Sequence, residues 1–202
     1  KDYDNAMADF TQAVALDANH AQAYYYRGEI FFEKNEYEKA ISDFDAAIKN
    51  KPDYAYAYND RGSAKVKLDK YEEAKSDYSQ ATQINPDMPF TYNNLGSAKK
   101  KLKDFKGAIA DYSTAIQKKP DYFIAYNNRG TAHFEQEEYQ DAIRDFEQAI
   151  KLNPSYYYAY NNRGNAKYKL QDYEGAIADY TKAIELNPSY GYAYLNRGIT
   201  YE

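Results

Sequence analysis

The sequence lacks cysteine and tryptophan, and it contains only two histidines among 202 residues. Without cysteine the chain forms neither disulfides nor thiolate metal sites, and the redox compartment stays undetermined. His20 and His133 lie far apart, and neither has a second ligand at metal-binding spacing such as His-Glu-x-x-His. The glycines are single, so no phosphate-binding glycine loop is present. We therefore expect no enzymatic activity, no metal site and no cofactor.

Long apolar runs and a strong charge imbalance are also missing. No run of 18 apolar residues exists, so no segment is expected to span a membrane. The formal net charge is -5, and basic residues form no chain-long run, which argues against nucleic-acid and membrane partners. No signal peptide is visible, but the chain begins at Lys1 without a methionine, so a removed leader or a trimmed terminus stays open. The compartment is undetermined, with the cytoplasm favoured.

A repeat of 34 residues dominates what is present. Proline recurs at this period (Pro52, Pro86, Pro120, Pro154 and Pro188), as does glycine (Gly28, Gly62, Gly96, Gly130, Gly164 and Gly198). A fixed period of this length is typical of a solenoid, in which one repeat cannot bury its apolar face alone. We therefore expect a single solenoid domain over residues 1–202. It divides into the second half of a repeat at 1–20, full repeats at 21–54, 55–88, 89–122, 123–156 and 157–190, and the first half of a repeat at 191–202.

Each repeat contains two apolar patterns of helical period. In residues 157–190 the second pattern places Tyr173, Ala176, Ile177 and Tyr180 at spacings of three and four, which makes one broad apolar face. Each second helix is expected to end before the proline, because proline disfavours helix in the preceding residue. No strand-like alternation appears, so the fold is predicted to be all-α. The residues after the prolines are expected to cap the next helix: Asp53, Asp87, Asp121, Ser155 and Ser189.

Small residues recur at the positions where the two helices are expected to meet. Glycine inside a helix costs about 1 kcal/mol relative to alanine, yet every first helix keeps one. We interpret this glycine as a point of close approach, with the second helix seated against it. Two alanine columns and two aromatic columns accompany it, among them Ala142 and Ala149 of the second helices and the series Phe10, Phe44, Tyr78, Tyr112, Phe146 and Tyr180.

The recurring glycine, paired alanines, aromatics and terminal proline resemble the tetratricopeptide repeat (TPR) family over essentially the whole chain. The resemblance implies an α-solenoid, a right-handed superhelix of antiparallel helix pairs whose first helices line a concave groove. It also implies a scaffold that binds proteins or peptides. One departure is an arginine beside the glycine, where the family more often has leucine, and only Leu95 keeps that type. These arginines are Arg27, Arg61, Arg129, Arg163 and Arg197.

An aspartate column in the second helices matches the arginine column. An arginine held near an aspartate between stacked helices can form a bidentate pair. We interpret the two columns as inter-repeat ion pairs that fix register, with a groove-facing anion site as the alternative. The aspartates are Asp9, Asp43, Asp77, Asp111, Asp145 and Asp179.

Asparagines supply the candidate peptide-binding residues. They recur one turn ahead of the glycine although asparagine is a mediocre helix former, and an amide offers both donors and an acceptor to a peptide backbone. The alternative is that they only cap or solvate the stack. Binding of an acidic chaperone tail is disfavoured, because the basic residues which that mode requires are replaced here. The candidates are Asn59, Asn93, Asn94, Asn127, Asn128, Asn161, Asn162 and Asn196.

Two further features suggest partners. Residues 89–122 contain seven lysines against three aspartates, which we interpret as a solvated face, or alternatively as a docking spot for an acidic segment. Residues 1–20 and 191–202 match complementary halves of a repeat and carry no polar cap. The alternative function is therefore a structural module that stacks head to tail. A role as the regulatory arm of an enzyme would require sequence outside this chain.

Overall fold

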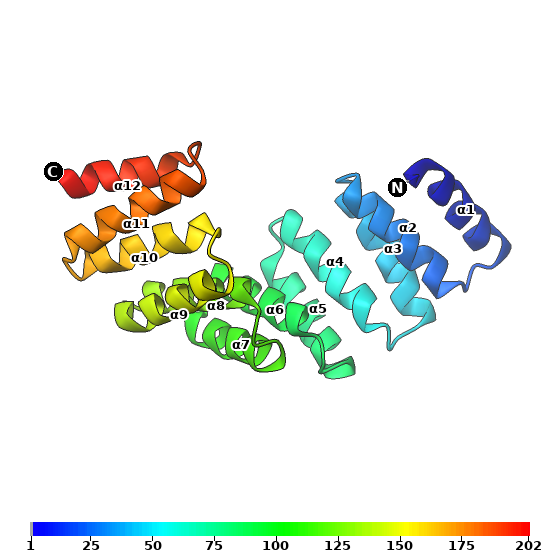
Figure 1. Ribbon diagram of the computed structural model, residues 1–202. Helices are drawn as coiled ribbons and strands as arrows, with labels where there is room; N and C mark the ends of the chain where they lie inside the picture. Colours follow the sequence, from blue (N-terminus) through cyan, green and yellow to red (C-terminus); the bar gives the residue numbers. More distant parts are fainter. Residues whose placement is uncertain (1) are drawn as a thin grey trace. The chain divides into compact units, whose positions relative to one another are not determined.

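The computed structural model describes residues 2–202, and Lys1 lies outside the described residues. Across that range the chain forms α-helices and no strands, which confirms the all-α prediction (Figure 1). The helices are α1 (Tyr3–Leu16), α2 (Ala21–Glu33), α3 (Tyr37–Asn50), α4 (Ala55–Lys67), α5 (Tyr71–Ile84), α6 (Pro89–Lys101), α7 (Phe105–Lys118), α8 (Phe123–Glu135), α9 (Tyr139–Leu152), α10 (Tyr157–Lys169), α11 (Tyr173–Leu186) and α12 (Gly191–Tyr201).

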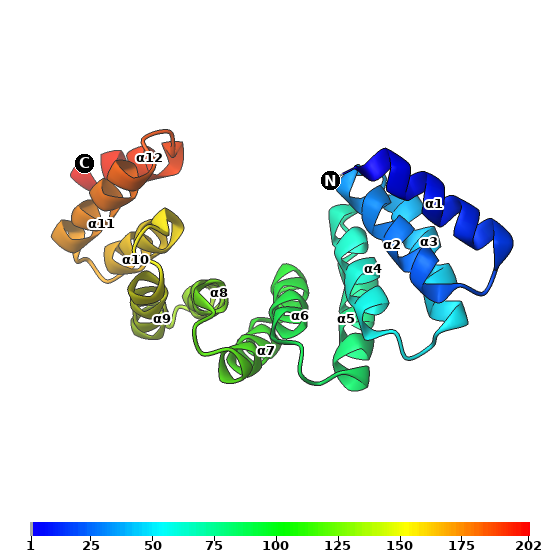
Figure 2. The same ribbon diagram turned by 45° about the vertical axis from the view of Figure 1, so that its right-hand side comes forward.

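The chain divides into two compact units, residues 1–102 with α1 to α6 and residues 103–202 with α7 to α12. Within the first unit, α2 and α3 form an antiparallel pair, as do α4 and α5. Within the second unit, α8 pairs with α9 and α10 with α11 (Figure 2). The single-domain organisation over residues 1–202 stays a prediction.

A left-handed residue closes the turn between the two helices of a pair. Asn35 (φ 61°) and Gln171 (φ 64°) are examples, and neither is a glycine. One residue in this conformation reverses the chain direction directly after the helix. The turns are therefore short, and the second helix folds back along the first.

The predicted caps after the prolines are wrong. The N-cap lies one position after the predicted residue and is a large side chain, such as Tyr54, Tyr122 or Tyr156. None of these three side chains makes a capping hydrogen bond. Ser155 instead donates its backbone N–H and its hydroxyl to Asn153 Oδ1, at 3.2 and 2.8 Å. The asparagine before the proline thus holds the serine inside the turn, and the N-cap of the helix, Tyr156, lies one residue beyond it.

An aromatic ring of the second helix packs against the glycine of the first helix in these pairs. A Cβ added to Gly28 would lie 2.8 Å from Phe44, and one added to Gly164 would lie 2.6 Å from Tyr180. Alanines on either side of the ring are fully buried, such as Ala142 of α9. The expected close approach is confirmed, and the group seated at the glycine is a ring.

Successive first helices contact one another within each unit: α2 with α4 and α4 with α6, then α8 with α10 and α10 with α12. The second helices α3 and α5, and likewise α9 and α11, share no close backbone contact in the described chain. The first helices therefore lie together on one face of each unit, and their outward side chains form a continuous surface there.

Candidate binding surface

The arginine beside the glycine forms an ion pair with an aspartate of the same helix pair. Arg27 of α2 donates from Nε and Nη2 to the two oxygens of Asp43 in α3, both at 2.7 Å. The aspartate side chains of these pairs are 5–8% exposed. Such a pair uses the fork of the guanidinium in a nearly dry environment. The same pairing recurs as Arg61–Asp77, Arg129–Asp145 and Arg163–Asp179.

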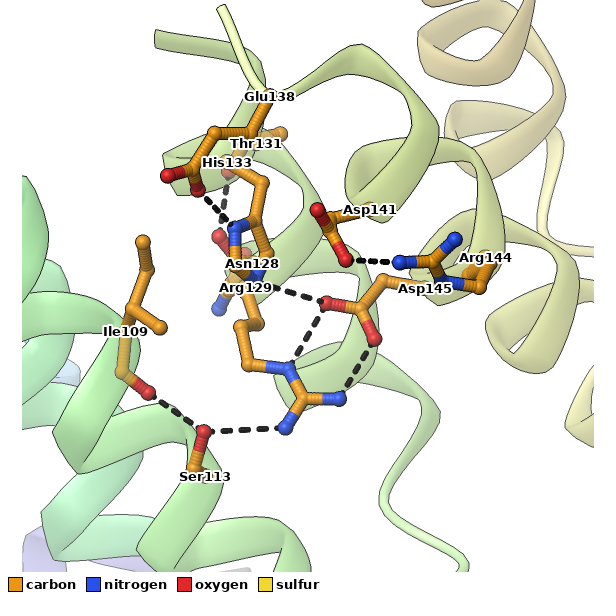
Figure 3. Close-up of polar contacts among 10 residues, drawn as sticks. All are labelled: Ile109, Ser113, Asn128, Arg129, Thr131, His133, Glu138, Asp141, Arg144 and Asp145. Carbon is orange, nitrogen blue, oxygen red and sulfur yellow. Dashed lines mark hydrogen bonds and ion pairs between the residues drawn. The ribbon is translucent and has the colours of Figure 1, made fainter. Parts of the chain in front are cut away.

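The remaining guanidinium nitrogen, Nη1, reaches the preceding repeat. Arg129 donates from Nη1 to Ser113 Oγ of α7 at 3.0 Å, while Nε and Nη2 hold Asp145 of α9 (Figure 3). Arg61 donates from Nη1 to Asp45 Oδ1 at 2.6 Å. The expected ion pair between repeats is therefore corrected for the aspartate column: the bidentate pair with that aspartate lies within a repeat, and Nη1 alone contacts the preceding one, as in the Arg61–Asp45 ion pair. This is the geometry that the 16-residue spacing to the aspartate, on either side of the short turn, allows.

Each of these arginines also lies against a tyrosine three residues earlier. The Cζ of Arg163 is 5.8 Å from the centre of the Tyr160 ring, within cation–π range. Equivalent contacts are made by Arg27, Arg61, Arg129 and Arg197. The guanidinium thus contacts the tyrosine ring on one face, and its hydrogen-bond donors are directed to the aspartate and to the preceding helix. We interpret the arginine column as structural, because the aspartate takes the donors that an external anion would need.

We call the arginine–aspartate pairs and the side chains bonded to them the aspartate seam. His133 belongs to it in the second unit. Its Nδ1 lies 2.6 Å from Glu138 Oε2, and its Nε2 lies 3.9 Å from Asp145 Oδ2 (Figure 3). Lys167 occupies the same register one repeat later, with Nζ 2.8 Å from Asp179 Oδ2. The other histidine, His20, accepts a hydrogen bond from the Ala23 N–H at the start of α2. Both histidines therefore have structural partners, and residues 2–202 contain no group of three or more side chains placed to hold a metal ion.

The asparagines link successive first helices. In the second unit Asn162 Nδ2 donates to Asn127 Oδ1, and Asn196 Nδ2 donates to Asn161 Oδ1, both at 3.0 Å. In the first unit Asn94 Nδ2 donates to Asn59 Oδ1 at 3.3 Å. We call each of these hydrogen bonds a rung. A rung joins the fifth residue of one first helix to the sixth residue of the next.

The two asparagines of each pair differ in exposure. Those at the fifth position, Asn93, Asn127 and Asn161, are 4–6% exposed and belong to the interior. Those at the sixth position are half-buried, and we call them the amide row: Asn94, Asn128, Asn162 and Asn196. Of the eight predicted peptide-binding residues, the amide row and Asn59 are thus half-buried, whereas the other three are buried. Peptide binding by these residues stays a prediction.

The first rung has different chemistry. Tyr25 replaces the buried asparagine, and its hydroxyl, which has one proton to donate, lies 2.7 Å from Asp60 Oδ2 and 3.1 Å from Glu29 Oε1. Burial raises the pKa of Asp60, and the hydrogen bonds from Tyr25 and Asn59 partly oppose that rise. Burial and the neighbouring carboxylates raise the pKa of Tyr25 as well. Sequence reasoning missed this cluster, although the break in the asparagine columns at Tyr25 and Asp60 marks it.

A row of exposed apolar side chains lies one helical turn before the amide row. It consists of the second residue of each first helix from α4 onward, between 36% and 69% exposed. The second and sixth residues of a helix share one face. We call this set the apolar row: Tyr56, Phe90, Ile124, Tyr158 and Tyr192. The first helices therefore present apolar side chains beside amides on the same surface.

Comparison with known proteins supports this architecture. Family models described as "Tetratricopeptide repeat" match residues 1–55, 55–88, 93–157, 127–191 and 161–202. No curated protein sequence matched the chain. Within residues 2–202 no helix is long and apolar enough to cross a bilayer.

Solved structures show the same fold at low sequence identity. The structure of YrrB, described as a TPR protein with an unusual peptide-binding site, is 23% identical, covers 94% of this chain and 97% of its own, and gives a TM-score of 0.78. MamA from Desulfovibrio magneticus RS-1 is 19% identical over 84% of this chain and 96% of its own, with a TM-score of 0.78. The APC/C assembly Cut9–Hcn1 is 17% identical over all of this chain and 40% of its own, with a TM-score of 0.82. The repeated helix pairs and the family matches together establish that the chain belongs to the tetratricopeptide repeat family.

Proposed function

We propose that this chain is a non-enzymatic binding module that holds an extended peptide or a partner helix along the first helices of each unit. The observation that carries the proposal is the apolar row lying beside the amide row. Exposed apolar side chains at a constant register are typical of an interaction surface rather than of scattered surface residues.

The amide row suits a peptide backbone. The Nδ2 groups of Asn162 and Asn196 are committed to the rungs, which fixes the orientation of each amide. Their Oδ1 atoms accept no hydrogen bond from other groups of residues 2–202. Such an oxygen can accept from a backbone N–H of an extended ligand without reading its side chains. The neighbouring apolar row then supplies contacts for the ligand's side chains.

The first test is selection from a random dodecapeptide library, followed by calorimetric titration of the recovered peptides. We expect saturable binding by monomeric protein. Tyr158→Ala removes an exposed ring of the apolar row, and an aromatic side chain that acts as a binding hot spot contributes about 2 kcal/mol or more. The variant should therefore bind at least roughly tenfold more weakly.

The matched control is Tyr173→Ala, which removes a ring of similar exposure, 47% against 42%, from the second helix α11. This variant should bind like the parent. Equal affinity of the parent and Tyr158→Ala, or equal losses in the two variants, would show that the apolar row is not the binding surface.

We propose as a second candidate that copies of the chain stack head to tail. A Cβ added to Gly198 of α12 would meet no atom within 4 Å, unlike those at Gly28 and Gly164. Phe10 of α1 occupies the register of the rings that fill those other glycine sites, and α1 has no buried residue. Phe10 of a second copy can therefore fill the site at Gly198. Lys1, which would lie near the same junction, is outside the described residues.

Concentration-dependent mass tests this candidate. Sedimentation equilibrium should show assemblies that grow with protein concentration, and Gly198→Leu, which fills the site, should return the protein to monomer. A parent that stays monomeric across the accessible concentrations would remove the stacking function and leave peptide binding untouched.

A further inference from the structure

A cavity of about 200 Å³ lies where α2, α3 and α4 meet in the first unit. Its lining is Glu29, Phe32, Glu33, Phe44, Asp60 and Ser63. Pockets for drug-sized ligands are larger, at roughly 300–1,000 Å³. The volume is therefore suited to one side chain of a partner rather than to a whole small molecule.

The next repeat contains an equivalent cavity with the opposite charge. It measures about 280 Å³ and is lined by Tyr78, Asn94, Lys101 and neighbours from α4, α5 and α6. Asn94 stands one repeat after Asp60, Lys67 stands one repeat after Glu33, and Lys101 enters the lining from α6. The backbone framework is thus shared, while the first cavity carries three carboxylates and the second carries none in its lining.

The carboxylates of the first cavity are arranged rather than scattered. The Tyr25 hydroxyl lies 2.7 Å from Asp60 Oδ2 and 3.1 Å from Glu29 Oε1, so these two carboxylates share one donor at one end of the cavity. Glu33 lies one turn after Glu29 on α2 and is exposed. No basic residue lines the cavity, and Lys34 beside it pairs with Asp4 of α1 at 2.9 Å.

The aromatic lining adds a second requirement on the ligand. Phe32 is half-buried and supplies ring surface beside the carboxylates, while the fully buried Phe44 lies behind it. Lysine and arginine bury their aliphatic stems on apolar surface while the charged head stays with polar partners. Their cations are also attracted to aromatic faces and form strong hydrogen bonds with carboxylates.

We propose that the cavity between α2 and α4 binds a lysine or arginine side chain of a partner peptide, with its cation among Glu29, Glu33 and Asp60 and its stem against Phe32. This assignment rests on the proposed function, because it names the residue type that a peptide places in this part of the first unit. A metal cation is not the occupant, since the described residues hold no group of three or more side chains placed as metal ligands.

The test uses peptides selected from the random dodecapeptide library against the parent protein. We expect a basic residue to be enriched at one position, and replacing that residue by glutamine should weaken binding roughly tenfold. Glu33→Gln in the protein should produce a similar loss. Glu33 is exposed near the end of its helix, so this variant should retain the parent's melting temperature.

The control is Lys101→Gln, which removes a charge from the lining of the second cavity. It should leave the contribution of the peptide's basic residue intact, whereas Glu33→Lys should abolish it. Selected peptides that bind but show no basic preference, or that bind the parent and Glu33→Gln equally, would overturn this assignment and leave the proposed function standing. Failure of every selected peptide to bind saturably would overturn both.

Discussion

The Cβ that alanine would place at position 164 lies 2.6 Å from Cε1 of the Tyr180 ring. That ring cannot retreat easily, because Tyr180 is 2% exposed and its hydroxyl donates to Asn165 Oδ1 at 2.9 Å. Gly164→Ala should therefore destabilise the protein by about 1–3 kcal/mol, even though alanine is the better helix former. Chemical denaturation measures the difference.

Gly198 provides the matched control for that substitution. It lies at the same register in α12, where an added Cβ meets no atom within 4 Å. Gly198→Ala should leave stability unchanged or raise it by up to about 1 kcal/mol through helix propensity. If Gly164→Ala were as stable as Gly198→Ala, the ring would not be what requires the glycine.

The stability of the protein should be sensitive to loss of a buried carboxylate from the aspartate seam. Asp179 receives Arg163 and Lys167, and its side chain is 5% exposed. Asp179→Ala should cost about 3–5 kcal/mol, because two cations lose their carboxylate. Glu147→Ala removes only the exposed partner of Arg163 at 3.8 Å, and it should cost no more than about 1 kcal/mol. Equal losses measured by urea denaturation would contradict the structural role of the seam.

Asp60 should make stability depend on pH in an unusual direction for an acid. Because burial raises its pKa in the folded state, the folded protein binds the proton more tightly than the unfolded chain does. The contribution of Asp60 to the free energy of unfolding therefore falls as pH rises from the unfolded pKa through the folded pKa.

Asp60→Asn isolates that contribution. Asparagine keeps an acceptor for Tyr25 and restores the residue type found at positions 94, 128 and 162. The variant should be more stable than the parent at pH 7, and the difference should shrink as pH falls towards the unfolded pKa of aspartate. A stability difference that is constant with pH would show that Asp60 ionisation is not the cause.

The asparagine rungs should couple energetically. Asn162→Ala leaves Asn127 Oδ1 without its donor at a site only 6% exposed, which typically costs about 1–3 kcal/mol, partly offset by the helix propensity of alanine. A double-mutant cycle with Asn127→Ala should give a coupling of about 0.5 kcal/mol or more. Additive losses would indicate that the rung is not a stabilising contact.

Periodicity predicted the fold well, because every repeat offers the same small and large residues at the same places. Gly164 and its equivalents indicated a close approach, and the structure places a ring there. The capping prediction failed at Ser155, because its N–H and hydroxyl both bind Asn153 Oδ1 within the turn, and residue type alone does not show which of two neighbours begins the helix.

The candidate surface was predicted less completely. The asparagine columns directed attention to the first helices, but a sequence column does not by itself show which amide turns inwards. Asn161 and Asn162 were therefore both predicted to bind peptide, and that role stays a prediction. The apolar row was not recognised, because Tyr158 reads like the other tyrosines until its exposure of 42% is known. The Tyr25–Asp60 contact joins residues 35 apart, and only the packing of α2 against α4 brings them together.

The central claim is that the face of the first helices binds peptide. Titration of the isotope-labelled protein with a library-selected peptide, followed by amide NMR shifts, tests it most directly. The account predicts saturable shifts clustered around Tyr158, Asn162 and their equivalents in the apolar and amide rows, with little change around Tyr173 of α11. Saturable shifts confined to the second helices would contradict it.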